Sequence, residues 1–374
     1  MHFVLFGNPE NRRVISFFEA VTASKKHTFS VISYLDLLDK RVNLAEHIRP
    51  NSILKIDSPG ENSLVRQRLI EYGEIPPSVN NAFLNDFGRI CYAEEWYRGF
   101  SLFLSDMKKQ LDALDTPYDL MNGIDSILTM FDKVACKAVL VKNNIPTPVS
   151  LNGISDYTTL RQQMKNQRIN SVFIKPAHSS SASGVIAFRT NDRHSQAISS
   201  VELSIEAGDI VLHNSLKIRT YTDETSIIPL INTILKSKNI VEQWVPKASF
   251  QGSAFDFRIV VINGRARHTV ARTSKSPITN LHLGNMRGNL ADIIAYIGTA
   301  NFEAAKKVAE QVASCFPDCL YMGVDVLISS NFKQIKVLEV NAFGDLLPNL
   351  LDEQESVYQA EINVVGKFIC REIV

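Results

Sequence analysis

Short apolar runs alternate with amphipathic stretches over the first third of the chain. Strands are predicted at residues 3–6, 29–32 and 53–56, and helices at residues 11–23 and from Leu64 through Ile70. Strands that alternate with amphipathic helices are typical of a parallel α/β sheet. The turn after the first strand, Gly7-Asn8-Pro9, lacks the GxGxxG fingerprint of a dinucleotide site. We therefore expect residues 1–118 to form an N-terminal Rossmann-like domain that is a scaffold or recognises a substrate.

The rest of the chain combines longer strands with separate helices. A helix is predicted from Ser126 to about Lys142, because Asn143 and Asn144 followed by two prolines form a helix stop. Further predicted elements are strands at residues 171–175, 185–188 and 239–245, β-branched strands after residue 250, a helix near residues 301–315, a hairpin across residues 323–341 and a terminal helix. We expect an α+β arrangement in two subdomains, residues 119–245 and 246–374.

Composition narrows the functional classes. The chain has 374 residues, is 45% hydrophobic and carries 40 basic against 39 acidic residues, a formal net charge of +1. This balance argues against disorder and against a dedicated nucleic-acid-binding protein, which needs an excess of basic residues. No apolar run approaches the roughly 18 residues of a membrane helix, and the start of the chain lacks a signal-peptide pattern. The five scattered cysteines favour free thiols, so we expect a soluble cytoplasmic protein that binds neither membranes nor nucleic acid.

The clearest chemical signal is a predicted hairpin that carries two acids. If the turn is centred near Phe332, in a polar Ser-Ser-Asn-Phe-Lys segment, Asp325 lies directly opposite Glu339. Asn341 follows Glu339 by two residues and so projects from the same face. Two carboxylates and an amide oxygen suit Mg²⁺, which completes its shell with phosphate oxygens. The alternative is a solvated polar face, which the otherwise apolar strands and the repulsion between adjacent acids disfavour.

Two further segments carry cations. Lys175 ends a predicted strand just before a loop of small polar residues that closes at Gly184, and the N–H groups of such a loop can approach phosphate oxygens. Asp256 and Arg258 share one face of another predicted strand, and Arg272 follows on the next strand. These arginines either form an exposed salt-bridge ladder or hold an anionic phosphate and stabilise transition-state charge.

The order of these segments resembles that of the ATP-grasp ligases, most closely their RimK-like and glutathione-synthetase-like branch. The segments that carry the resemblance are, in chain order, Asp132-Lys133, Phe173-Ile174-Lys175-Pro176, Val241-Glu242-Gln243-Trp244-Val245, Asp256-Phe257-Arg258, Asn280-x-His282-x-Gly284 and Asp325 with Glu339-Val340-Asn341. The ordered series is more specific than any one segment, and it covers roughly residues 119–345. The N-terminal segment resembles the domain that precedes the ATP-grasp fold in this family.

The resemblance implies that ATP is held between two α+β subdomains and assigns residues to it. The implied ATP contacts are Lys133 and Lys175, the loop residues Ser181, Ser183 and Gly184, and the adenine-side residues Glu242, Gln243, Trp244 and Val245. The implied ligands of Mg²⁺, or of Mn²⁺ in its place, are Asp325, Glu339 and Asn341. Arg258 and Arg272 match catalytic arginines near the transferred phosphate, and Asp256, Asn280 and His282 match a substrate-side group.

Two segments depart from the family pattern. The loop that covers the phosphates is usually rich in glycine, but the loop here contains only Gly184. After Asn341 the family often has a Pro-Gly-type turn, whereas this chain has Ala-Phe-Gly-Asp-Leu-Leu-Pro at residues 342–348. The second departure changes the acceptor side of the implied site.

The resemblance implies an ATP- and Mg²⁺-dependent carboxylate–amine ligase that acts through an acyl-phosphate and releases ADP and phosphate. Its substrates would be small-molecule or peptide carboxylates and amines, and the sequence identifies neither of them nor the oligomeric state. Two alternatives are a kinase on the same fold that stops at phosphorylation and a non-catalytic ATP-binding regulator. The complete set of Asp325, Glu339 and Asn341 disfavours the regulator, which has less need of a metal site.

Overall fold

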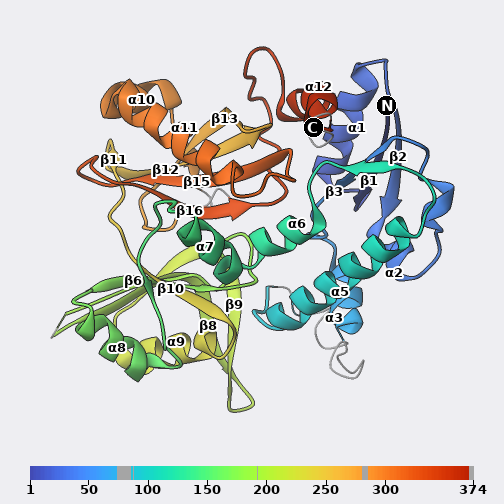
Figure 1. Cartoon of the computed structure of the whole chain (residues 1–374). Coiled ribbons are helices and arrows are strands. Elements are labelled where there is room, and N and C mark those ends of the chain that lie inside the picture. The colour runs from blue at the N-terminus through green and yellow to red at the C-terminus, as the bar shows by residue number, and fades with distance from the viewer. Residues whose placement is uncertain (74–85, 87, 192, 280–284, 370–374) are drawn as a thin grey trace.

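A computed structural model describes residues 1–73, 86, 88–191, 193–279 and 285–369 of the chain. These residues form three β-sheets, and the second and third sheets lie one above the other beside the N-terminal sheet (Figure 1). No helix in these ranges is long and apolar enough to cross a membrane. The four cysteines that the structure describes are free thiols, as the sequence predicts.

The N-terminal sheet has four parallel strands in the order β2-β1-β3-β4. The strands are β1 (His2–Gly7), β2 (Thr28–Ser33), β3 (Ser52–Ile56) and β4 (Tyr118–Leu120), and the helices are α1 (Arg12–Ala23), α2 (Tyr34–Leu38), a 3-10 turn (Leu44–Glu46), α3 (Ser63–Tyr72) and α5 (Ala93–Asp112). Every residue of β3 is buried, as in a strand covered on both faces. The predicted parallel α/β sheet is therefore confirmed, and β4 extends it just past residue 118.

The second sheet has six antiparallel strands in the order β5-β10-β6-β7-β8-β9. Its strands are β5 (Ser150–Leu151), β6 (Ser171–Pro176), β7 (Ile186–Thr190), β8 (Ser195–Glu206), β9 (Asp209–Tyr221) and β10 (Asn239–Gln243). Helices α8 (Tyr157–Asn166) and α9 (Glu224–Leu235) cover one face, where Leu160, Leu230 and Ile174 share a buried apolar cluster. The other face is left to the site described below.

The third sheet is also antiparallel, in the order β14-β13-β12-β15-β16 with β11 beside β12. Its strands are β11 (Ser249–Phe250), β12 (Ser253–Ile262), β13 (Arg265–Ser274), β14 (Met286–Arg287), β15 (Tyr321–Ile328) and β16 (Ile335–Asn341), and its helices are α10 (Leu290–Ile297) and α11 (Thr299–Ala313). The terminal helix α12 (Val357–Ile369) packs against both β12 of this sheet and α1 of the N-terminal part.

The helix predicted from Ser126 to Lys142 is two helices, α6 (Ile124–Phe131) and α7 (Lys133–Lys142). The break falls at Asp132, whose extended backbone ends α6 and whose side chain accepts hydrogen bonds from the N–H groups of Val134 and Ala135. This is a helix N-cap, which satisfies donors that the first turn leaves unpaired. The cap places Lys133 at the first position of α7, where the helix meets the second sheet.

A buried ion pair joins the N-terminal sheet to the C-terminal helix. The Nζ of Lys55 in β3 lies 2.9 Å from Glu361 in α12, and these residues are 1% and 0% exposed. The same Nζ lies 3.6 Å from the ring centroid of Tyr321 in β15. Separation of these parts would leave two charges without partners in an apolar interior, which is costly. The N-terminal sheet, the third sheet and α12 are therefore held together.

Candidate active site

A cleft of about 810 Å³ lies between the second and third sheets. Ten of the residues singled out in the sequence line it, namely Lys133, Lys175, Glu242, Gln243, Val245, Asp256, Arg258, Arg272, Asp325 and Glu339. They come from α7, β6, β10, β12, β13, β15 and β16, and from the segment that follows β10. The fold thus gathers charges that are spread over two hundred residues of sequence.

Asp325 and Glu339 are directly opposite each other on β15 and β16, as the hairpin prediction requires. Beyond this pair the register shifts, because Val326 pairs with Val337 and Leu338 is left as an extra residue. Asp325 lies 3.0 Å from Arg272 Nη2 and 3.2 Å from Arg258 Nη2. Burial opposes the charged form of Glu339, but the charges of Lys133, Lys175 and Arg258 outweigh it and lower its pKa. Each acid is thus paired with cations from other elements.

The oxygen donors at this hairpin suit a hard cation. Among the described residues, no group of three or more His, Cys, Asp and Glu could hold a metal ion, so protein ligands here would be the two carboxylates and an amide. Asn341 is two residues from Glu339 on the same strand, does not line the cleft, and has a buried Nδ2 with no hydrogen-bond partner. A site with few protein ligands is typical of Mg²⁺ bound together with substrate phosphates.

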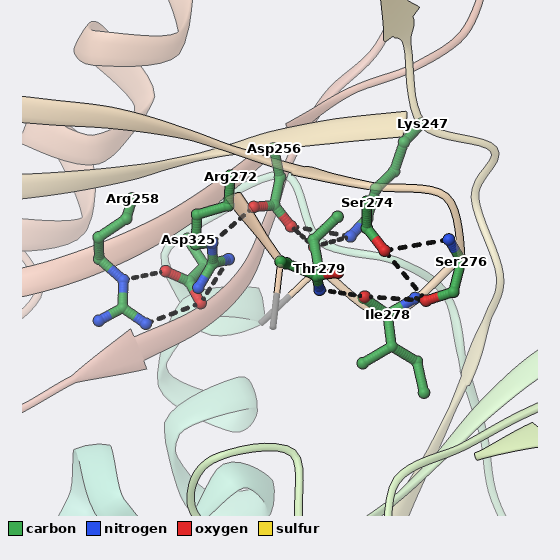
Figure 2. A network of polar contacts seen from close by, with 10 residues as sticks. Lys247, Asp256, Arg258, Arg272, Ser274, Ser276, Ile278, Thr279 and Asp325 are labelled. Carbon is green, nitrogen blue, oxygen red and sulfur yellow. Dashed lines mark hydrogen bonds and ion pairs between the residues drawn. The ribbon is translucent and has the colours of Figure 1, made fainter. Parts of the chain in front are cut away.

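Figure 2 shows a polar network that continues from Asp325 across the third sheet. Asp256 and Arg272 are paired across β12 and β13, with Arg272 Nε 2.7 Å from the carboxylate. Lys247 Nζ lies 2.8 Å from the other oxygen of Asp256, and Thr279 donates its hydroxyl to that oxygen too. Burial raises the pKa of Asp256, but the charges of Arg272 and Lys247 outweigh burial and lower it to about 2. This network orients Arg272 toward Asp325.

On the opposite wall, Glu242 holds two lysines. Lys175 Nζ lies 2.6 Å and Lys137 Nζ lies 2.5 Å from its two carboxylate oxygens. The carboxylate is 5% exposed, and the lysine charges outweigh burial and lower its pKa. The side chain of Glu242 therefore positions lysines, and its backbone is paired with β5 on one side and β6 on the other. The adenine-side role that the resemblance implies for Glu242 stays a prediction. Lys133 reaches the same region, 3.3 Å from Glu339.

The small-residue loop joins β6 to β7 along the edge of the cleft. Ser179, Ala182 and Val185 line the cleft, whereas the predicted Ser181, Ser183 and Gly184 do not. Ser181, Ala182 and Gly184 have positive φ angles of 53°, 60° and 74°. A Cβ on Gly184 would also lie 2.7 Å from Cγ of Pro176. The one glycine of this loop thus occupies a position that needs glycine.

The end of β10 and the residues that follow it supply part of the cleft wall. Gln243 and Val245 line it, while Trp244 lies outside the lining with its ring 5.5 Å from that of Phe173. Pro148, Val185, Ile278 and Leu338 complete these walls. Asn280 and His282 lie outside the described residues, so the structure gives them no position.

Four site residues were missed in the sequence, namely Lys137, Lys247, Thr279 and Asp345. Asp345 lies 3.0 Å from Nη1 of Arg258, at the end of the network. Lys137 carried a usable signal, since it follows Lys133 by four residues and so shares its helix face. The other three lie in loops, where spacing does not predict which side chains converge.

Comparisons with known proteins bear on the family and the fold of the chain. Residues 130–360 match the model of the YheC/D like ATP-grasp family. A search of the curated proteins finds no match.

Three solved structures resemble the whole chain. The D-cycloserine synthetase DcsG is 13% identical with a TM-score of 0.57, and each chain is covered to 100%. The ATP-grasp ligase PsnB, complexed with a phosphomimetic variant of its minimal precursor, Mg and ADP, is 13% identical with a TM-score of 0.55, covering 99% of this chain and 98% of that one. The D-alanine–D-alanine ligase from Bacillus anthracis, complexed with ATP, is 13% identical with a TM-score of 0.51, covering 100% and 98%.

These likenesses confirm the predicted fold class, a parallel N-terminal sheet followed by a two-sheet ATP-grasp fold. The narrower resemblance to the RimK-like and glutathione-synthetase-like branch stays a prediction, as do the domain boundaries at residues 118 and 245.

Proposed function

Because the chain belongs to the YheC/D-like ATP-grasp family, we propose that it is an ATP- and Mg²⁺-dependent carboxylate–amine ligase. The observation that carries the proposal is the convergence of two arginines and two lysines on the Asp325–Glu339 pair within one cleft. Such an arrangement suits phosphoryl transfer, where a protein contributes mainly positioning and charge stabilisation. A protein that only binds ATP has less need of these charges.

The proposed reaction has two steps. An oxygen of the substrate carboxylate bonds to the γ-phosphorus of ATP as the bond to the β-phosphate oxygen breaks, giving an acyl-phosphate and ADP. The nitrogen of an amine then bonds to the acyl carbon, the bond to the phosphate oxygen breaks, and the nitrogen proton leaves with the phosphate. Neither step needs a covalent enzyme nucleophile.

The residues that line the cleft would bind different parts of MgATP. Lys133 and Lys175 would contact phosphates, and the apolar walls beside Val245 would enclose the base. Asp325, Glu339 and Asn341 would hold Mg²⁺, which supplies charge neutralisation at the phosphates. Arg258 and Arg272 lie next to the acid pair and would stabilise the transferred phosphate.

The test is ADP formation from MgATP with pools of carboxylates in the presence of hydroxylamine. Hydroxylamine converts an acyl-phosphate to a hydroxamate, so a ligase should yield ADP and hydroxamate in equal amounts. The variant Arg272→Gln should bind MgATP yet form neither product. A kinase that phosphorylates a hydroxyl group would give ADP and a phosphate ester without hydroxamate, and a non-catalytic regulator would bind MgATP without forming ADP. Either result would overturn the proposal.

A further inference from the structure

The segment at residues 342–348 carries an acid on the far side of Arg258 from the acid pair. Asp345 lies 3.0 Å from Arg258 Nη1, while Arg258 Nη2 lies 3.2 Å from Asp325. The side chain of Asp345 is 28% exposed, against 5% for Asp325. Asp345 is therefore the member of this network that a ligand can reach.

An acid at this position works against phosphate binding. A carboxylate beside Arg258 reduces the positive potential that would hold a transferred phosphate, and unit charges a few ångströms apart interact strongly near a protein surface. Burial raises the pKa of Asp345, but the charges of Arg258 and Arg13 outweigh burial and lower it, so the acid keeps its charge. The position is explained if Asp345 serves a second, cationic ligand.

Arg13 faces the same segment from the N-terminal domain. Its Nη1 donates to the carbonyl oxygen of Phe343 at 2.7 Å and lies 3.8 Å from Asp57. Its side chain is 26% exposed, and among the described residues Nε and Nη2 donate no hydrogen bond. The side chain of Asp57 is only 4% exposed, so it is the buried partner of this guanidinium. A pre-oriented arginine with unused donors suits a carboxylate.

Sheet topology independently points to the same place. In the order β2-β1-β3-β4, β1 connects to β2 on one side of the sheet, and β3 connects to β4 on the other side. Arg13 follows the carboxyl end of β1, and Asp57 follows that of β3. Ligands of open α/β sheets bind outside the carboxyl ends of the strands where the strand order reverses. Arg13 therefore lies at that point, and its hydrogen bond to Phe343 joins it to the segment that carries Asp345.

We propose that Asp345 and Arg13 form the acceptor subsite, and that it takes an α-amino acid with its ammonium at Asp345 and its carboxylate at Arg13. The inference rests on the proposed function, because it takes Arg258 as the residue beside the acyl-phosphate. It assigns the N-terminal domain a direct role in choosing the acceptor. The proposal also gives residues 342–348, which replace the Pro-Gly-type turn of the family, a role in binding the acceptor.

The experiment is calorimetric titration of the full chain, with saturating Mg²⁺ and a non-hydrolysable ATP analogue. The probes are single L-amino acids, glycine, D-alanine and dialanine, and each that binds is compared with its decarboxylated amine and its N-acetyl derivative. Asp345→Asn and Arg13→Gln are measured beside Asp352→Asn and Arg12→Gln. Asp352 is a control because it is an acid paired with a different arginine, Arg267. Arg12 is a control because it is an exposed arginine next to Arg13 on α1.

We expect the decarboxylated amine and the N-acetyl derivative to bind at least tenfold more weakly than the amino acid. Asp345→Asn and Arg13→Gln should weaken binding of the amino acid at least tenfold, and Asp352→Asn and Arg12→Gln should leave it unchanged. Asp345→Asn should bind the ATP analogue as tightly as the parent or more tightly, because an acid beside Arg258 has been removed. If that variant loses nucleotide binding, Asp345 serves only to hold Arg258 in place, and the proposed subsite is wrong. Absence of binding by every probe, or equal binding of the N-acetyl derivative, would also overturn it.

The two proposals can fail separately. Amino acids that bind through Asp345 and Arg13 in a protein that forms no ADP would leave the subsite standing and refute the ligase. ADP and hydroxamate formation with an acceptor that is a thiol or an alcohol would leave acyl-phosphate chemistry standing and refute the subsite.

Discussion

Asp325 and Glu339 lie opposite each other on β15 and β16, and each acid is paired with cations from other elements. Two adjacent acids without such partners would repel each other, and neutralising one of them would not lower stability. The cations reverse this for Asp325. Arg258 and Arg272 both depend on Asp325, so neutralising it would leave two mostly buried guanidinium groups short of a partner.

The first prediction follows for Asp325→Asn. Removing one partner of a buried ion pair costs about 3–5 kcal/mol, and the side chain of Asp325 is 5% exposed. Arg258 keeps Asp345 and Arg272 keeps Asp256 as a partner, so we expect a fall toward the lower end of that range in the free energy of unfolding, measured by urea denaturation. Asp352→Asn is the matched control, because this acid is paired with Arg267 but is 35% exposed, and such pairs contribute about 0–1 kcal/mol. Equal effects of the two substitutions would contradict the assigned role.

The second prediction concerns the metal. If Asp325, Glu339 and Asn341 bind one ion, Glu339→Gln should remove most of the dependence of ATP affinity on Mg²⁺, measured by calorimetry with Mg²⁺ and with a chelator. Residues that act as a unit give non-additive effects, so Glu339→Gln/Asn341→Ala should lose little more than either single variant. Fully additive losses would show that these side chains act separately.

Some of this site could be predicted because it depends on local rules. The alternation of side chains along a strand puts Asp256 and Arg258 on one face, and a hairpin with a polar turn fixes which residues are opposite. Asp256 and Arg258 both line the cleft, and the register pairs Asp325 with Glu339. The bulge at Leu338 could not be predicted, because it depends on packing of the third sheet and not on the pattern of the strand.

Contacts between distant segments were beyond the sequence pattern. Lys137 and Glu242 are 105 residues apart, and Arg13 and Phe343 are 330 apart. The break between α6 and α7 was missed because apolar residues continue on both sides of Asp132. The hairpin of β8 and β9 was missed because its serines and charged residues weaken the apolar alternation that identifies a strand.

The third prediction is that Lys175→Ala weakens MgATP binding more than folding. Glu242 keeps Lys137 as a partner at 2.5 Å, so the carboxylate is not left alone. The lost phosphate contact should cost about 1.5–3 kcal/mol of affinity, as for other hydrogen bonds to charged groups. Calorimetry checks the affinity, with Lys165→Ala as an exposed control in α8. Unchanged affinity in folded Lys175→Ala would exclude the lysine from the phosphate site.

The fourth prediction uses two glycines with nearly equal backbone angles. Gly184 and Gly153 have φ angles of 74° and 71°, but a Cβ would meet Pro176 at 2.7 Å in the first and nothing within 4 Å in the second. Both alanine variants carry the strain of a left-handed residue, roughly 1–2 kcal/mol. Gly184→Ala should therefore be the more destabilised by thermal unfolding, and it alone should bind MgATP less tightly. Matching behaviour of the two variants would mean that the loop does not need glycine at residue 184.

The fifth prediction is a pH dependence that arises from Asp256. Its pKa is lowered from 3.8 to about 2 by Arg272 and Lys247 against the effect of burial. A group whose pKa is lower in the folded protein contributes stability above its unfolded pKa, and that stability is lost as pH falls toward the folded value. The difference between the two pKa values corresponds to about 2 kcal/mol, and the carboxylate is 1% exposed, so solvent does not screen it.

The free energy of unfolding of the parent minus that of Asp256→Asn should thus be constant between pH 5 and 7 and shrink between about pH 4 and 2. Urea denaturation across this range measures the difference, and the other acids titrate equally in both proteins. A difference that stays constant down to pH 2 would mean that Asp256 is not held ionised by its two cations, and Arg272 would then lack the support that directs it to Asp325.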